Sequence, residues 1–517
     1  MRLAGPAGLL DRPPRPVRPA AVVVTEEGLG RRAARGAAST GAGLVARISL
    51  QVVSVVVLAR LLGPDAYGLI AMVVAVIGVS ELLRDFGLSS AAIQAPSLSP
   101  QQRSNLFWSN TAIGLALTLV VLAAGPVLMA AVYAGRHLTG TDLDALREIT
   151  RALSVTFLLN AMMTQYRASL LRAMRFAVVA TIDVLAPASA LVVAIVAALA
   201  KAGYWALVAQ QLTQSAVALV ACVLVGRWLP APRWYSGQQM RRFFTFGGFL
   251  LLSQLIGYVA NNVAVFVIGR RFSVDDAGLY NRAYQLLMNP LNQVRAPSTT
   301  VALPVLSRAG HSPQFDRIVR TGQLVLGYPV AVGLGFVIGT AYPLVDVLLG
   351  ARWSGVAPIL RLLAVAGAMS TMAYIGYWVY LARALTRQLM WYTVVTSVLQ
   401  IVLIVAGAHW GTVGVAGGYA LAATLEWPLS LFWLSRITPM PTRALYASAT
   451  RILTIGTGVT LASAGAAWAA RSAPSWTGLV AGAAAGLAVA AAATLLPAVR
   501  RDLGELVHAL RAAVSRR

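Results

Sequence analysis

Residues 52–69 read VVSVVVLARLLGPDAYGL, and residues 262–279 read NVAVFVIGRRFSVDDAGL, so the second stretch begins 210 residues after the first. Seven of the seventeen positions from 53 to 69 are identical in the two stretches. Valine and leucine recur by chance in apolar helices, but matched arginine, aspartate and glycine residues indicate a duplication. The identical pairs are Val53/Val263, Val55/Val265, Val57/Val267, Arg60/Arg270, Asp65/Asp275, Gly68/Gly278 and Leu69/Leu279.

The chain around these stretches is apolar enough to lie mostly in a membrane. Its 517 residues are 58% hydrophobic and 11% charged, whereas a soluble protein of this length would need far more charge. A bilayer core of about 30 Å takes roughly 20 apolar residues per helix, which predicts about fourteen spans. The expected spans are 41–62, 66–83, 105–132, 152–171, 177–200, 203–226, 245–269, 278–300, 322–349, 356–381, 390–408, 411–434, 452–470 and 475–498.

The duplication arranges these spans into two halves. Six spans separate its copies, an even number, so both copies cross the membrane in the same direction. Repeats of this kind are related by a pseudo-twofold axis along the membrane normal. We therefore predict an all-α integral membrane protein with six-helix bundles at 41–226 and 245–434 that face each other across a central cavity. Two further spans at 452–498 follow outside the bundles.

Basic residues lie unequally on the two sides of the predicted membrane. With a cytoplasmic amino terminus, about 29 of the 42 Lys and Arg residues fall inside and about ten outside. Cytoplasmic loops carry such an excess, so both termini are predicted to be cytoplasmic. Residues 1–40, rich in Arg and Pro, are expected to be a disordered basic tail, and 499–517 a basic cytoplasmic tail at the membrane surface.

Five stretches together resemble one family, over about residues 41–435. Taken in their order along the chain, these stretches resemble the bacterial polysaccharide exporters, which are the Wzx-like flippases of the multidrug, oligosaccharidyl-lipid and polysaccharide superfamily. The stretches are LARLLGPDAYGLIAMVVAVIGVSELLRDFGLSSAAIQ (58–94), LSPQQRSNLFWSN (98–110), YWALVAQQL (204–212), IGRRFSVDDAGLYNRAYQLLMNPLNQV (268–294) and VLLGARWSGVAPILRLLA (347–364).

The resemblance implies a flippase that moves undecaprenyl-diphosphate-linked oligosaccharide across the bacterial cytoplasmic membrane by alternating access. Membrane lipids, a polysaccharide polymerase and glycosyltransferases are the partners to expect, without nucleic acid, cofactor or enzymatic activity. Two other functions remain open, and a purely structural membrane scaffold is a third alternative. A cation-coupled multidrug exporter of the same superfamily would use buried carboxylates, and a membrane glycosyltransferase or polymerase would normally have a large outer loop.

Sequence motifs for nucleotide or metal chemistry are missing from the chain. Lys201 is the only lysine, and the residue after it is Ala202 rather than the Ser or Thr of a P-loop. The four histidines are scattered without the spacing of metal ligands. Cys222 is the only cysteine, which excludes an internal disulfide.

Polar residues inside the predicted spans mark a candidate substrate path, because such residues are costly in lipid and face protein or a wet cavity. The largest set is Arg282, Gln285, Asn289 and Asn292 in the span at 278–300. Spacings of three, four and three place one cation and three amides on a single helical face. We predict that this face binds a diphosphate and sugar hydroxyls; hydrogen bonding between helices is the alternative.

A second polar set lies on the first and seventh spans. Arg47 and Gln51 are four residues apart on the first, and the duplication places Asn261 opposite Gln51, with Asn262 beside it. These spans would line the interface of the two bundles, where pseudo-symmetric transporters bind substrate. The alternative for Arg47 is that it reaches the cytoplasmic headgroups.

Three carboxylates within the spans are candidates for coupling transport to protons or sodium. They are Glu81, Asp183 and Glu426. Ion pairing with neighbouring arginines is the alternative role for such groups.

Overall fold

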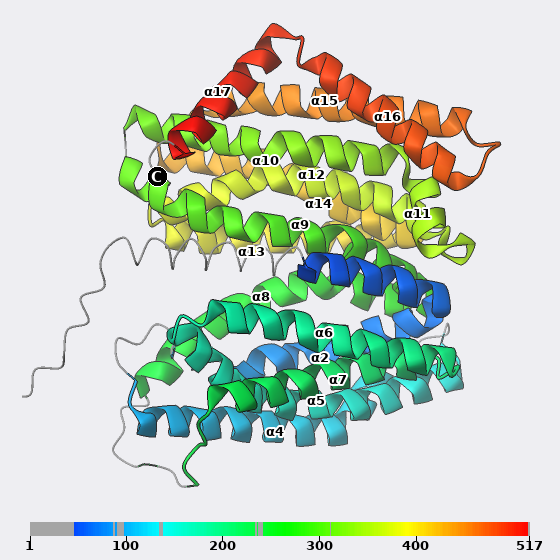
Figure 1. Cartoon of the computed structure of the whole chain (residues 1–517), viewed down its shortest axis with the longest axis vertical. Coiled ribbons are helices and arrows are strands. Elements are labelled where there is room, and N and C mark those ends of the chain that lie inside the picture. Colours follow the sequence, from blue (N-terminus) through cyan, green and yellow to red (C-terminus); the bar gives the residue numbers. More distant parts are fainter. Residues whose placement is uncertain are drawn as a thin grey trace, which may run out of the picture.

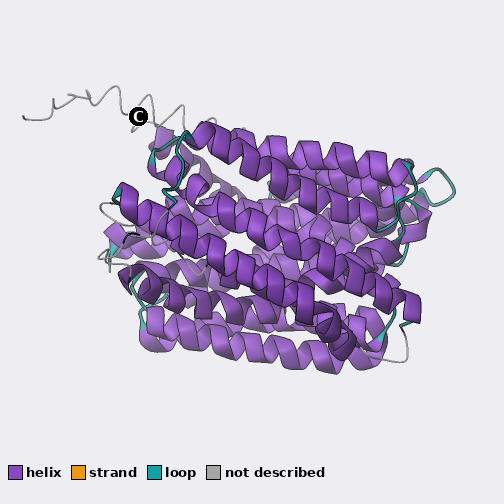
Figure 2. Ribbon diagram, turned by 90° about the horizontal axis from the view of Figure 1, so that it is seen from below, coloured by secondary structure: helices purple, strands orange, loops and turns teal. Residues whose placement is uncertain are grey.

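The computed structural model describes residues 46–85, 88–89, 92, 98–133, 138–232, 235, 241–310 and 312–514. The tail expected at 1–40 lies outside this part of the chain. Within it, every regular element is a helix (Figures 1 and 2). The helices are residues 46–61, α2 (Pro64–Asp85), α4 (Pro100–Tyr133), α5 (Gly140–Arg172), α6 (Phe176–Leu199), α7 (Trp205–Gly226), α8 (Arg241–Arg271), α9 (Val274–Ala309), α10 (Pro313–Gly339), α11 (Ala341–Leu349), η1 (Ala351–Trp353), α12 (Val356–Ala382), α13 (Thr386–Gly407), η2 (Ala408–Trp410), α14 (Gly411–Ile437), α15 (Thr442–Ala469), α16 (Ser475–Ala493) and α17 (Pro497–Val514).

Many of these helices are of membrane-spanning length and composition. Nine stretches of the described residues qualify, and one of them, Thr386–Ile437, contains both α13 and α14. The prediction of an all-α, multi-pass membrane protein is confirmed, while the count of fourteen spans stays a prediction. The ninth expected span is divided between α10 and α11 at Thr340, whose backbone leaves the helical conformation.

Two groups of helices follow one another along the longest axis of the molecule (Figure 1). The helix at 46–61 and α2 to α7 form the amino-terminal half, in which α4 packs on α5 and α6 on α7. α8 to α14 form the carboxy-terminal half, in which α12 packs on α9 and α14. The halves meet mainly where α2 packs against α9. The residue bounds predicted for the two bundles stay a prediction.

The duplicated arginines join the halves at the helix ends on the side where α11 lies, to the right in Figure 1, and this side is called the α11 end. Arg60 donates to the carbonyl oxygens of Val347 and Leu348, the latter at 3.3 Å, near the end of α11. Arg270 donates to the carbonyl of Val132 at 2.7 Å, near the end of α4. Each arginine of the pair therefore binds a helix carboxyl terminus of the opposite half, where free carbonyls favour a cation.

The last three helices lie on the outside of the carboxy-terminal half. α15 packs on α10 and α16 packs on α15. α17 covers most of the expected basic tail, and Asp502 holds it to the bundle. This carboxylate is 1% exposed and accepts from Arg320 at 3.0 Å, from Arg451 at 2.9 and 3.0 Å, and from the hydroxyl of Tyr328 at 2.8 Å.

Candidate substrate cavity

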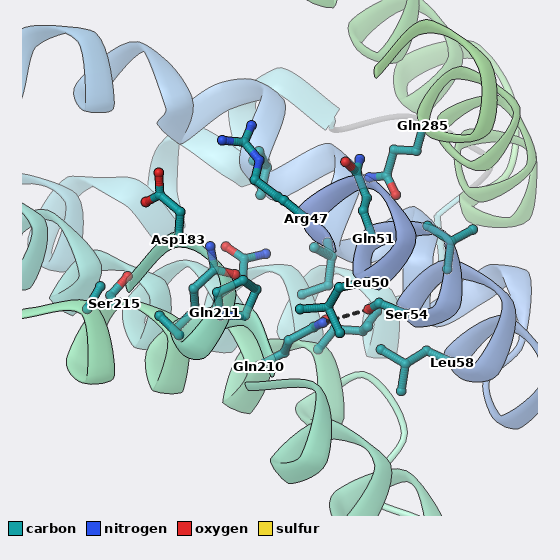
Figure 3. Close-up of a pocket in the computed structure, with 18 of the residues that line it drawn as sticks. Arg47, Leu50, Gln51, Ser54, Leu58, Asp183, Gln210, Gln211, Ser215 and Gln285 are labelled. Carbon is teal, nitrogen blue, oxygen red and sulfur yellow. Dashed lines mark hydrogen bonds between the residues drawn. The ribbon is translucent and has the colours of Figure 1, made fainter. Parts of the chain in front are cut away.

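A cavity of about 660 Å³ opens among the helix at 46–61, α2, α5, α6, α7 and the beginning of α9 (Figure 3). It therefore belongs to the amino-terminal half, except for the wall that α9 supplies. The polar side chains that line it are Arg47, Gln51, Ser54, Tyr67, Asn160, Arg167, Asp183, Gln210, Gln211, Gln214, Ser215, Asn281, Arg282 and Gln285.

The first helix presents Arg47, Gln51 and Ser54 to this cavity. Their spacings of four and three residues keep them on one helical face. Gln51 accepts a hydrogen bond from Gln293 of α9 at 2.7 Å, and Ser54 accepts one from Gln210 of α7 at 3.0 Å. Arg47 is exposed. The predicted pair of Arg47 and Gln51 is thus on the cavity wall, and the helix is tied to both α7 and α9.

Arg282 forms the α9 wall together with Gln285. A capping box between Ser273 and Asp276 sets the start of α9, so that Arg282 lies roughly two turns into the helix. The residue is 2% exposed, and its guanidinium carbon lies 3.4 Å from the ring centroid of Tyr67, in α2. One terminal nitrogen donates to Gln285 at 3.1 Å, while Nε and Nη2 have no partner among the described residues.

The environment of Arg282 is unusual for a buried cation. No carboxylate pairs with it in the described part of the chain, and a buried charge normally requires such a partner. The aromatic face of Tyr67 stabilises the cation only partly. An anion that enters the cavity would supply the missing charge and acceptors.

Asp183 of α6 binds Arg167 of α5 on another part of the wall. Both oxygens take part, at 2.6 Å to Nη1 and 2.8 Å to Nη2. This bidentate contact agrees with ion pairing, the alternative considered for Asp183. The pair adds hydrogen-bonding groups to the cavity without adding net charge.

Four predicted binding residues lie elsewhere. Asn289 and Asn292 continue the polar face of α9, but only the first part of α9 borders the cavity, and Asn292 is exposed. Asn261 and Asn262 of α8 are also outside the lining, and Asn262 donates to the carbonyl of Tyr258 in its own helix at 2.9 Å. Their predicted binding role therefore stays a prediction without support from this cavity.

The other two carboxylates differ in their surroundings. Glu81 accepts from Asn160, a residue of the cavity wall, at 3.0 Å. Glu426 lies in the carboxy-terminal half, in a separate cavity of about 50 Å³. Oxygen-bearing side chains of Ser370, Thr396 and Tyr419 share this small cavity. In the described part of the chain no cluster of three or more His, Cys, Asp and Glu could hold a metal ion.

The sequence analysis missed the glutamines of α7. Gln210, Gln211 and Gln214 all line the cavity, and Gln210 and Gln211 are labelled in Figure 3. Three amides within five residues of an apolar span meet the criterion that selected the polar face of α9. The signal was present, and only the packing of α7 against α5 and α6 reveals that it faces the same cavity.

Two solved structures share this fold at low sequence identity. One is the lipid II flippase MurJ in an inward closed conformation, with a TM-score of 0.69 and 14% identity over 90% of this chain and 99% of that protein. The other is an inward-facing multidrug resistance MATE family transporter of the MOP superfamily, with a TM-score of 0.57 and 15% identity over 78% and 99%. These likenesses establish the transporter fold.

Sequence comparison identifies the family. The lipopolysaccharide biosynthesis protein WzxC of Escherichia coli is 25% identical over 407 residues, which are 77% of this chain and 80% of that protein. The teichuronic acid biosynthesis protein TuaB of Bacillus subtilis is 25% identical over 57% of this chain and 59% of its own length. A profile of the family described as polysaccharide biosynthesis protein matches residues 57–358, more than half of the sequence. The chain therefore belongs to the polysaccharide biosynthesis protein family, as the resemblance of its motifs indicated.

Proposed function

We propose that this protein is a flippase that moves undecaprenyl-diphosphate-linked oligosaccharide across the bacterial cytoplasmic membrane, for polysaccharide biosynthesis and export. The observation that carries the proposal is Arg282, a buried cation without a carboxylate partner in the described residues, on the wall of an amide-lined cavity. A diphosphate loses its hydration on entering such a cavity, and fixed cations and amides replace it. The relatives named for lipopolysaccharide and teichuronic acid biosynthesis support this substrate class.

Alternating access is the mechanism we propose. The halves are equivalent by duplication and touch along α2 and α9, so they can rock against each other about this contact. In the present conformation, Arg60 and Arg270 join them at one end of the molecule. We place this end on the outer side and both termini in the cytoplasm, following the distribution of arginine.

A multidrug exporter shares the fold, so the cavity must distinguish the two functions. Three arginines and one aspartate line the described cavity, whereas recognition of cationic drugs calls for excess carboxylate. The charge therefore favours an anionic substrate. A membrane glycosyltransferase or polymerase would normally have a large outer loop. No connection between the described helices is long enough to form a separate catalytic domain, which favours the flippase over this alternative.

We further propose Glu426 as the coupling carboxylate. Unlike Asp183, it has no arginine within salt-bridge distance among the described residues, and it lies in a separate cavity of the carboxy-terminal half. Arg295 donates to Ser370, which lines the same small cavity, at 2.9 Å. Occupancy of this cavity by a proton or sodium ion could thus alter contacts between α9 and α12.

Arg282→Ala tests the function. We expect it to stop export while membrane abundance stays near normal, because it leaves no carboxylate unpaired in the described surroundings. Arg282→Lys should keep partial activity, since it retains the charge but not the planar fork of donors. The measurements are membrane abundance and polymer export, with Arg147→Ala on the exposed surface as control. Normal abundance with normal export would overturn the binding role, and low abundance would indicate a structural one.

A further inference from the structure

The net charge of the side chains that line the cavity indicates the charge of the headgroup that it can bind. Four charged side chains line it among the described residues: Arg47, Arg167, Asp183 and Arg282. The bidentate contact between Arg167 and Asp183 cancels one positive charge. Arg47 and Arg282 have no carboxylate partner in the described part of the chain. The cavity thus offers two uncompensated positive charges.

Two positive charges match one diphosphate. A diphosphate that joins a lipid to a sugar carries about one negative charge on each phosphate. The two negative charges of the diphosphate therefore equal the two positive charges of Arg47 and Arg282, without any contribution from the glycan. An additional carboxylate on a sugar would enter a partly enclosed space without a counter-charge, which is unfavourable.

The remaining polar wall is suited to uncharged sugars. Gln210, Gln211 and Gln214 of α7 and Asn160 of α5 present carboxamides, which both donate and accept hydrogen bonds. Sugar hydroxyls also do both, so amides match them without introducing charge. In Figure 3, Asp183, Gln210 and Gln211 lie on one side of the cavity, and Gln51 and Gln285 on the other.

We infer that the cavity selects a glycan whose sugars carry no net charge, with the diphosphate as the only anion of the headgroup. This inference rests on the proposed function and deepens it. Asp183 acts as the specificity determinant, because it neutralises Arg167 and keeps a third positive charge out of the cavity. An acidic glycan would require that charge.

The test compares two lipid-diphosphate-linked oligosaccharides of equal length, one neutral and one with a uronic acid, in vesicles that contain the purified protein. The wild-type protein should transport the neutral compound preferentially. Asp183→Asn frees Arg167 and should shift the ratio of acidic to neutral transport upward by roughly tenfold, equivalent to about 1.4 kcal/mol. Arg167→Gln leaves Asp183 unpaired and should shift the ratio in the opposite direction.

Two further variants complete the experiment. The double variant Arg167→Gln/Asp183→Asn removes both charges and should restore the wild-type ratio, which a general folding defect would not do. Asp144→Asn breaks a similar pair with Arg147, 2.9 Å long and exposed on the surface, and should leave the ratio unchanged. A wild-type ratio in both single variants, or wild-type preference for the acidic compound, would overturn the inference and leave the flippase function standing. Transport of neither compound by the wild-type protein would overturn both.

Discussion

Gly68 of α2 and Gly278 of α9 make reciprocal contacts across the interface between the halves. A Cβ atom on Gly68 would overlap the carbonyl oxygen of Val274, and one on Gly278 would overlap the carbonyl oxygen of Pro64. The two glycines are a matched pair of the duplication, and so are the positions 64 and 274 that they contact. The pseudo-twofold relation predicted from sequence is therefore realised where the backbones of α2 and α9 approach closely at these two glycines.

Alanine at either glycine should weaken this interface. The atom that it meets is backbone, which cannot rotate away, so we expect each variant to lose roughly 1–3 kcal/mol of stability. Thermal unfolding of the purified protein measures the effect, and the two losses should be similar. Gly333→Ala is the control, because a Cβ there meets no atom within 4 Å. Wild-type stability of both variants would contradict the close approach.

Arg60 and Arg270 should stabilise the contact between the halves at the α11 end to a similar degree. Replacing either by alanine removes the hydrogen bonds of a cation to a helix terminus, a net loss of about 1 kcal/mol, and shifts the conformational equilibrium about fivefold towards separation of the halves there. Spin-label distances across the α11 end report this shift. The double variant should open further than either single variant, and unchanged distances in all three would rule out the role.

Asp502 should anchor α17. Asp502→Asn leaves Arg320 and Arg451 without their shared carboxylate, and we expect a loss of roughly 2–3 kcal/mol because the two arginines remain partly exposed to solvent. Thermal unfolding and protease sensitivity of α17 are the measurements. Glu505→Gln on the same helix removes only an outer contact to Arg320 at 3.3 Å and should cost less than about 1 kcal/mol. Equal effects of the two substitutions would contradict the anchoring role.

Glu426→Gln should uncouple transport from its driving ion. The amide cannot release a proton or balance a cation, so transport should no longer respond to an imposed proton or sodium gradient, while headgroup binding persists. Flux in vesicles with each gradient in turn tests this. Glu81→Gln is the comparison, since Glu81 contacts the main cavity through Asn160. If Glu81→Gln alone abolished the dependence of transport on the gradient, Glu81 beside the substrate cavity would be the coupling carboxylate instead of Glu426.

Cysteine labelling should establish the orientation. Cys222→Ser removes the only cysteine of the chain, after which single cysteines can be placed at Ser312, before α10, and Ser472, between α15 and α16. We expect a membrane-impermeant maleimide to label position 472 in intact cells and position 312 only after the membrane is opened. The reverse pattern would invert the proposed topology.

The sequence by itself determined the helical membrane architecture and the relation between its halves. Long apolar runs must satisfy their backbone hydrogen bonds within helices, and the matched Arg60/Arg270 and Gly68/Gly278 pairs could be aligned before any contact was known. It also selected Arg282, because an arginine and amides at helical spacing are unusual in an apolar span.

Tertiary packing decided which of those polar residues share a cavity. The polar face of α9 is continuous in sequence, yet Gln285 lines the cavity and Asn292 is exposed, because only the first part of α9 borders the cavity. Likewise, the pairing of Asp183 with Arg167 and the inward direction of Gln211 depend on how α5, α6 and α7 pack together. Helical periodicity specifies which residues share a face of one helix, whereas the partner of that face is set by contacts between segments far apart in the chain.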